Sequence, residues 1–264
     1  MDNHNYLELA INAAKTSGEI LIGNFVTVKD FNIKNGNIRD VVTEVDLLSE
    51  KNIINIIKAQ FPDHMIVGEE MGTTGNSSGG YVWYIDPIDG TVNYSQGIEL
   101  CVVSIALIKG GKPIVGVIYN PFSQELYYAE RGQGAYKNDS IIDVGDKASC
   151  RDCLFIAGFS SEKSKDKKDE YQVFGQINDS SRGALRLGSA ALALAYLAEG
   201  KIDGFWIVEP KVWDVAAGIL IASEAGALVS DFNGQEISVQ AKNICASSEK
   251  IHQEFLSYLE PIKR

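Results

Sequence analysis

Apolar residues recur at helical spacing in two stretches near the start of the chain. Over residues 5–24 the spacing predicts an amphipathic helix with one buried face, formed by Leu7, Ala10, Ile11, Ala14, Ile20 and Leu21. A second, isoleucine-rich helix is expected to end at Phe61-Pro62. Its start has the pattern of a capping box, with Thr43 as N-cap and Asp46 three residues on. Asp46 is therefore expected in a first helical turn.

Short apolar runs separated by turn residues predict strands farther along the first half. MIVGEE is expected to be a strand that ends in Glu69 and Glu70, and YVWYI has the length of a buried strand with Asp86 at its tip. From 101 to 138, apolar runs alternate with turns such as Gly110-Gly111 and Asn120-Pro121. This pattern is typical of an antiparallel meander.

Strand-like and helix-like segments alternate in the second half. LFIAGF, DGFWIV, LVSDF and NICASS favour strands, whereas GSAALALAYLAEG, WDVAAGILIASEAGA and SSEKIHQEFLSYLEPI favour helices. The charged run SSEKSKDKKDE indicates a solvated loop or a helix start. Composition changes near 145–153, so we predict a mixed α/β fold in two halves, 1–148 and 149–264.

The composition limits the classes of partner. The 264 residues are 45% hydrophobic, enough for a sizeable core, and carry a formal net charge of −11. This charge argues against a general attraction to nucleic acid or an anionic membrane surface. No signal-peptide pattern is present, and no apolar run approaches the roughly 18 residues of a membrane span. We expect a cytoplasmic protein with neither nucleic acid nor membrane as partner.

The cysteines and histidines offer little chemistry. Cys150 and Cys153 form one C-x-x-C pair, but no second pair or histidine cluster stands beside it. A loop leading into a strand is the favoured interpretation, with a redox or metal role as the alternative. His4, His64 and His252 lie outside the motifs considered next.

Acidic residues stand at the ends of several predicted buried elements, namely Glu69, Glu70, Asp86, Asp89 and Asp214. Charges at such positions are costly unless they are paired or bind a metal. WYIDPID and EEMGTTG contain no lysine or arginine, so gathered carboxylates would repel one another. A divalent cation removes this conflict, and oxygen ligands suit Mg²⁺ or Mn²⁺.

The spacing of the D-P-I-D segment favours a metal site, although an ordinary Asp-rich turn is the alternative from local sequence. The proline permits a sharp turn in which the carboxylates of Asp86 and Asp89 and the carbonyl of Ile88 face one point. Gly90 and Thr91 can then open a helix or tight turn whose amides bind a phosphate oxygen. The Thr91 hydroxyl can orient a water molecule.

Two other ligand-binding motifs do not fit. An EF-hand requires glycine where Thr91 stands, counting from Asp86, and the P-loop pattern is absent. RGQGAYK, at 131–137, has two glycines and is expected to be a turn.

The segments DVVTEVD, GEE, WYIDPIDGTVNY and WDVAAGILIASEAGA, in this order and at these separations, closely resemble the inositol monophosphatase family of Mg²⁺-dependent, lithium-sensitive sugar phosphatases. The resemblance covers nearly the whole chain, and the D-P-I-D-G-T and W-D-x-A-A-G segments are each specific. It implies a layered αβαβα fold, usually homodimeric, with the active site between the halves and a small phosphorylated substrate.

The resemblance also implies two or three Mg²⁺ ions. Glu69, Asp86 and the Ile88 carbonyl would hold the first, and Asp86, Asp89 and Asp214 the second; a third, weaker ion would sit by Glu69. Two such ions, about 3.5–4 Å apart, can stabilise both ends of an in-line displacement at phosphorus.

Further roles follow from the same resemblance. Asp46 would pair with Thr91, and Thr91 and Glu69 would hold the attacking water. Gly90 and Thr91 would bind phosphate through their amides. Gly188, Ser189 and Ala190 would contact the substrate's ring, and Lys34 would lie in a loop near the metals.

One position departs from the inositol-specific pattern. Ile207 stands where a glutamate, seven residues before Asp214, is expected to bind inositol hydroxyls. Glu209 is a candidate replacement, since it would lie on the same face of a strand about 7 Å away. We expect inositol monophosphate hydrolysis. The alternatives are hydrolysis of NADP, fructose 1,6-bisphosphate or adenosine 3′,5′-bisphosphate, and a non-enzymatic regulatory protein with a structural ion.

Overall fold

The first two helices form where the apolar spacing predicts them. In the computed structural model, which describes residues 5–25, 32–33, 41–76, 78–159 and 167–263, α1 spans Tyr6–Asn24 and α2 spans Glu44–Gln60. The Thr43 hydroxyl accepts the N–H groups of Val45 and Asp46, and the Asp46 carboxylate accepts the Thr43 N–H. This capping box fixes Asp46 in the first turn of α2, as predicted.

Eight strands form the first large sheet, in the order β10-β9-β8-β7-β6-β5-β3-β4. Only β3 and β5 pair in parallel, so the predicted antiparallel meander over 101–138 is confirmed from β6 to β9, and β10 extends it. The turn expected at 131–137 is wrong for its last three residues, which form β9 because they pair with β8. The strands are β3 Met65–Gly68, β4 Gly72–Thr74, β5 Tyr81–Asp89, β6 Val102–Lys109, β7 Lys112–Asn120, β8 Glu125–Glu130, β9 Ala135–Lys137 and β10 Ser140–Ile142. Two short strands, β1 Asn32–Ile33 and β2 Val41–Val42, pair separately.

The D-P-I-D segment does not leave the sheet in a sharp turn, which differs from the sequence prediction. Strand β5 continues to Asp89, with Asp86 opposite Ser104 and Asp89 opposite Val102. Between these two pairs β5 advances by three residues and β6 by only two, so β5 contains one extra residue in a β-bulge. A β-bulge is a position where a strand tolerates proline. The short helix α3, Thr91–Ser95, follows.

Five strands form the second large sheet, in the order β12-β11-β13-β15-β14. Strand β11 is parallel to both neighbours, and β15 is antiparallel to both of its own. The strands are β11 Leu154–Gly158, β12 Gly183–Leu185, β13 Gly204–Val208, β14 Leu228–Ser230 and β15 Asn243–Ser247; the helices are α4 Lys168–Ser180, α5 Ala190–Ala198, α6 Val212–Glu224 and α7 Glu249–Tyr258. The sequence did not predict β4, β10 or β12.

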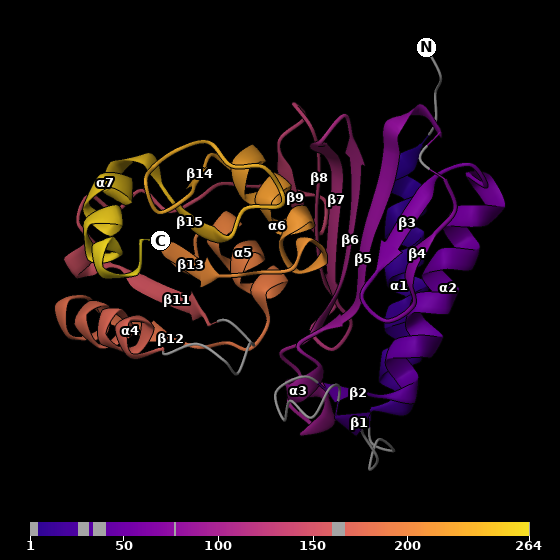
Figure 1. The fold of residues 1–264 in the computed structure, drawn as a ribbon, viewed down its shortest axis with the longest axis horizontal. Coiled ribbons are helices and arrows are strands. Elements are labelled where there is room, and N and C mark those ends of the chain that lie inside the picture. Colours follow the sequence, from indigo (N-terminus) through magenta and orange to yellow (C-terminus); the bar gives the residue numbers. More distant parts are fainter. Residues whose placement is uncertain (1–4, 26–31, 34–40, 77, 160–166, 264) are drawn as a thin grey trace.

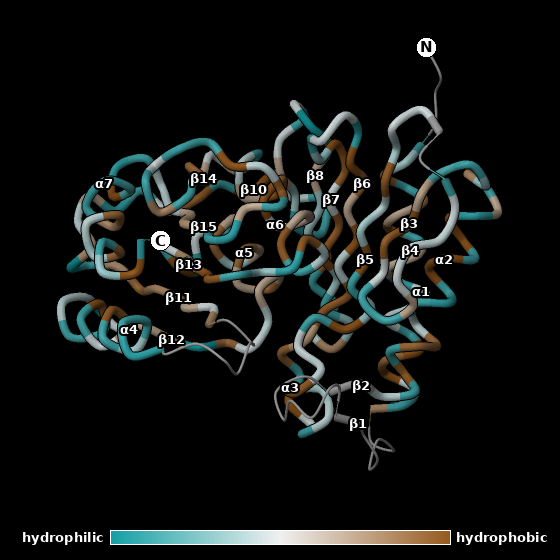
Figure 2. Tube along the Cα trace, in the orientation of Figure 1, coloured by the Kyte–Doolittle hydropathy of each residue, from teal (hydrophilic) through white to brown (hydrophobic). Residues whose placement is uncertain are grey.

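Helices and sheets alternate in five layers (Figure 1). Helices α1 and α2 cover the outer face of the eight-stranded sheet, α5 and α6 lie between the sheets, and α4 and α7 cover the far face of the second sheet. Figure 2 shows hydrophobic segments in the central strands. Three clusters of buried apolar side chains, from these strands and from the helices packed on them, fill the spaces between the layers. The αβαβα prediction is confirmed, while the division near residue 148 stays a prediction.

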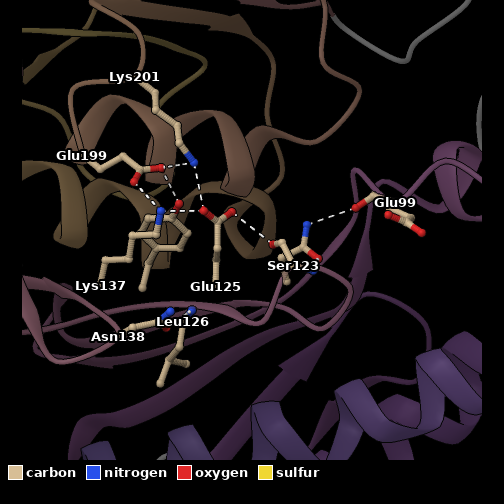
Figure 3. A network of polar contacts seen from close by, with 10 residues as sticks. Glu99, Ser123, Glu125, Leu126, Lys137, Asn138, Glu199 and Lys201 are labelled. Carbon is tan, nitrogen blue, oxygen red and sulfur yellow. Dashed lines mark hydrogen bonds and ion pairs between the residues drawn. The ribbon is translucent and has the colours of Figure 1, made fainter.

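A ring of alternating charges joins the eight-stranded sheet to the C-terminal end of α5 (Figure 3). Lys137 Nζ lies 2.5 Å from an oxygen of Glu125 and 2.6 Å from one of Glu199. Lys201 Nζ lies 3.0 Å and 2.6 Å from the same two carboxylates, and the Tyr127 hydroxyl donates to Glu199 at 2.5 Å. The ring anchors the end of α5 that lies away from the carboxylates described next.

Candidate active site

The structure brings together three of the predicted carboxylates, from segments far apart in the chain. Glu69 follows β3, Asp86 lies in β5 and Asp214 lies in the first turn of α6. One oxygen from each lies within 4.8 Å of the others. An all-oxygen set of this kind can hold a hard divalent cation such as Mg²⁺.

Electrostatics at these carboxylates fit a bound cation. Burial raises the pKa of Asp86 well above its ordinary value, and the charges of Glu69, Asp89 and Asp214 raise it further. Burial and the charges of Asp89 and Glu69 raise the pKa of Asp214 in the same way. None of Asp86, Asp89 and Asp214 forms an ion pair within the described residues. A divalent ion would relieve this repulsion, so the donor set fits Mg²⁺ or Mn²⁺.

Asp89 is held by the start of α5. Its Oδ2 accepts hydrogen bonds from the Ser189 hydroxyl and the Ala191 N–H, both at 2.6 Å. Burial nevertheless raises the Asp89 pKa to about 6, and these hydrogen bonds lower it only in part. The predicted loop residue Ser189 therefore contacts a carboxylate directly, and it is also the N-cap of α5.

Thr91 and Asp46 meet, as the resemblance implies. The Thr91 hydroxyl lies 3.3 Å from Asp46 Oδ1 and 3.0 Å from the Ile88 carbonyl oxygen. The Thr43 N–H and hydroxyl donate to the other Asp46 oxygen at 2.8 and 2.6 Å, so this carboxylate is fixed. Gly90 has φ +103° at the start of α3, a conformation that favours glycine.

A cavity of about 140 Å³ opens beside Asp89 and Asp214. Its wall combines apolar side chains with one cation, and its lining includes Phe159, Phe205, Ile207, Arg186, Gly188, Ser189 and Ala190. Arg186 follows β12 and makes no hydrogen bond or ion pair within the described part of the chain. Sequence reasoning missed Arg186, because its place depends on how the short strand β12 joins the sheet.

The two residues weighed for inositol specificity are placed differently. Ile207 lies on β13 and lines the cavity. Glu209 lies beyond the end of β13 with φ +53°, and it is not among the described residues that line the cavity. Ile207 and Glu209 were expected on one face of a strand, but the strand ends before Glu209. Lys34 lies outside the described residues.

Sequence reasoning also missed Glu50, which is fully buried on α2. Its carboxylate accepts the N–H groups of Glu70 and Met71, both at 2.8 Å. A charged residue among the buried apolar positions of a helix, here between Val45 and Ile53, is the signal that could have revealed it.

The C-x-x-C pair lies in the core. Cys150 and Cys153 are both buried, and burial raises the pKa of the Cys153 thiol to about 12 and that of Cys150 further. Their thiols face the carbonyl oxygens of Ile251 and Ser149. Protonated, buried thiols of this kind pack as small apolar groups.

Comparison with known proteins places this geometry in a family. The model of the inositol monophosphatase family matches residues 2–264. The fructose-1,6-bisphosphatase/inositol-1-monophosphatase of Aquifex aeolicus is 39% identical over 94% of this chain and 92% of its own length. The Nus factor SuhB of Pasteurella multocida is 35% identical over 97% of this chain and 96% of its own length. The solved IMPase of Thermotoga maritima has a TM-score of 0.88 at 32% identity, covering 97% of both chains.

Proposed function

The chain belongs to the inositol monophosphatase family, and from this premise we propose that it is a Mg²⁺-dependent phosphomonoesterase that hydrolyses inositol monophosphate to inositol and phosphate. The observation that carries the proposal is the convergence of Glu69, Asp86 and Asp214 within 4.8 Å, with Asp214 at the wall of a cavity. Such a site can activate water directly, so neither a histidine base nor a serine nucleophile is needed.

The proposed ligands of two or three Mg²⁺ ions are the carboxylates of Glu69, Asp86, Asp89 and Asp214 and the carbonyl of Ile88. Bound divalent ions would supply Lewis-acid chemistry, lowering the pKa of water and neutralising charge on the phosphate and the leaving oxygen. The pKa values of Asp86 and Asp214 are raised by burial and by the charges of neighbouring carboxylates, which supports this assignment.

Other residues would position the reactants. The Thr91 hydroxyl, held between Asp46 and the Ile88 carbonyl, would orient the attacking water together with Glu69. The amides of Gly90 and Thr91 would bind phosphate oxygens. Gly188, Ser189 and Ala190 would contact the substrate, while Ser189 also holds Asp89.

A different substrate preference is the second candidate, and two cavity residues favour it. Ile207 cannot hydrogen-bond an inositol hydroxyl, and Arg186 offers a cation to a second anionic group. Fructose 1,6-bisphosphate and NADP both carry such a group besides the phosphate to be hydrolysed, a second phosphate in the former and the pyrophosphate in the latter. Contacts of Glu209 and Lys34 with the substrate stay predictions.

A non-enzymatic regulatory role is the third possibility, and a relative named as a Nus factor makes it worth testing. The complete set of metal-binding and water-orienting residues supports an enzyme instead, since a structural ion does not need Thr91 paired with Asp46. No helix among the described residues is long and apolar enough to cross a membrane. A homodimer, a cytoplasmic location and the absence of a nucleic-acid partner remain expectations.

The test is phosphate release from inositol 1-phosphate, fructose 1,6-bisphosphate and NADP, each with and without Mg²⁺, compared by kcat/KM. We expect Mg²⁺-stimulated release with inositol 1-phosphate preferred. A higher kcat/KM for either of the others would support the second candidate. Absence of Mg²⁺-stimulated release from all three would refute the proposal.

A further inference from the structure

One face of α2 carries three buried polar side chains, Asp46, Ser49 and Glu50, at the i, i+3, i+4 spacing that places residues side by side. Each contacts a different segment around the metal-binding carboxylates. Asp46 meets Thr91, and the Ser49 hydroxyl donates to the Pro87 carbonyl oxygen at 3.4 Å. Glu50 reaches the segment that carries Glu69.

The Glu50 carboxylate is engaged at both oxygens. Oε2 accepts the Glu70 N–H and Oε1 accepts the Met71 N–H, each at 2.8 Å. These two residues and Glu69 form the three-residue loop between β3 and β4. A buried carboxylate on α2 therefore ties down the loop from which Glu69 projects.

Gly68 gives independent evidence that this arrangement is built into the sequence. A Cβ at Gly68 would lie 2.0 Å from Glu50 Oε1 and 2.5 Å from its carboxyl carbon. Gly68 is the last residue of β3, directly before Glu69. Only glycine leaves room for the carboxylate at this point.

We propose that Glu50 is a positioning residue: by fixing the loop through two charge-assisted hydrogen bonds, it holds the Glu69 carboxylate in the group with Asp86 and Asp214. The inference rests on the proposed function, in which Glu69 is a metal ligand. Glutamine cannot replace Glu50, because its NH₂ group would face one of the two N–H donors.

The test is Glu50→Gln, with Mg²⁺ binding measured by calorimetry and by the shift in unfolding temperature, and with kcat and KM measured at saturating Mg²⁺. We expect the Mg²⁺ dissociation constant to rise about 10-fold to 100-fold, while the KM for inositol 1-phosphate changes less than about threefold. Gly68→Ala should give the same weakening, because it displaces the Glu50 carboxylate. The double variant should be no weaker than either single variant.

Glu224→Gln is the matched control. The Glu224 carboxylate also accepts two backbone N–H groups, from Gly132 at 2.8 Å and Gly134 at 3.0 Å. It lies ten residues beyond Asp214 on α6, or about 15 Å along the helix. This variant should lose stability but keep the wild-type Mg²⁺ affinity.

The outcomes separate the two proposals. If Glu50→Gln lowers stability but leaves Mg²⁺ affinity unchanged, as expected for the control, Glu50 is only structural and the inference is wrong. If the wild-type protein binds Mg²⁺ but releases no phosphate, the proposed function fails, and weaker Mg²⁺ binding in Glu50→Gln still supports the positioning role. A wild-type protein that binds no Mg²⁺ would overturn both.

Discussion

The hydroxyl of Ser189 lies 2.6 Å from Oδ2 of Asp89, so the N-cap of α5 is bonded directly to the last residue of β5. The Ala191 N–H donates to the same oxygen. Both donors favour the ionised carboxylate, against the burial that raises its pKa to about 6. The cavity wall and the carboxylates are therefore joined across two segments about one hundred residues apart.

Asp89→Asn should abolish turnover while the fold is retained. The asparagine oxygen can still accept from Ser189 and Ala191, but the negative charge that would bind a metal ion is lost. Substitution of a residue that only supports a metal ligand lowers metal affinity or activity about 10-fold to 100-fold. Loss of a direct ligand should therefore lower kcat at least about 100-fold. Phosphate release and circular dichroism measure the two effects.

A control for this variant is Asp231→Asn, which makes the same chemical change at a carboxylate that accepts the N–H groups of Asn233 and Gln235. Its kcat should stay within about twofold of wild type. Unchanged turnover in Asp89→Asn would show that Asp89 is not a metal ligand. Lost turnover with unchanged biological activity would favour the non-enzymatic role.

Mg²⁺ should increase the free energy of unfolding, because a cation relieves the repulsion among the buried carboxylate of Asp86 and the half-buried carboxylates of Glu69 and Asp214. At a concentration 100 times the dissociation constant the increase is about 2.7 kcal/mol. Thermal unfolding with Mg²⁺, with EDTA and with NaCl at equal ionic strength measures it. Asp214→Asn should remove most of the increase. An equal increase with NaCl, or in Asp214→Asn, would contradict a specific site.

Patterns within single segments predicted much of the fold. The Thr43 and Asp46 pair predicted the start of α2, and alternating apolar runs and turns predicted the meander. These features follow from local hydrogen bonding and from burial of one face, which a sequence displays directly. The acidic ends of buried elements likewise pointed to the carboxylate group.

Features that depend on contacts between distant segments were missed or predicted differently. Pro87 favours a turn locally, but the pairing of β5 with β6 keeps this segment in the sheet, where a β-bulge accommodates it. Glu50 has its partners twenty residues away, and Arg186 reaches the cavity only because β12 adds to the edge of the second sheet. Local propensity contains no information about these contacts.

Ile207→Glu should shift substrate preference toward inositol 1-phosphate. The new carboxylate would enter the cavity beside Asp89 and Asp214, where it can accept from a substrate hydroxyl. We expect the ratio of kcat/KM for inositol 1-phosphate to that for fructose 1,6-bisphosphate to rise about 10-fold, because the added charge also repels a second phosphate. Ile207→Leu, which keeps the wall apolar, should leave the ratio unchanged. An unchanged ratio in Ile207→Glu would refute this account of specificity.

Glu199→Gln should destabilise the protein, because it leaves Lys137 and Lys201 with one carboxylate between them. The Glu199 side chain is 9% exposed and the lysines are 21% and 41% exposed, so solvent screens part of the effect. We expect a loss of about 1–3 kcal/mol in urea unfolding. Glu260→Gln, in the exposed pair with Lys263, should change stability by less than about 0.5 kcal/mol. Equal effects of the two variants would show that the ring adds nothing beyond a surface ion pair.

His252 should make stability fall as the pH drops below about 6.5. Its ring is buried, with the hydroxyl oxygens of Ser230 and Ser247 each 2.9 Å from a ring nitrogen, and burial lowers its pKa in the folded state. The unfolded chain, with a histidine pKa near 6.5, then binds more protons below this pH, so protonation favours unfolding. Urea unfolding between pH 7 and pH 5 should show a loss of stability that is absent from His252→Asn. Other titrating groups cancel in the difference between the two proteins, so equal pH slopes would show that His252 keeps an ordinary pKa when folded.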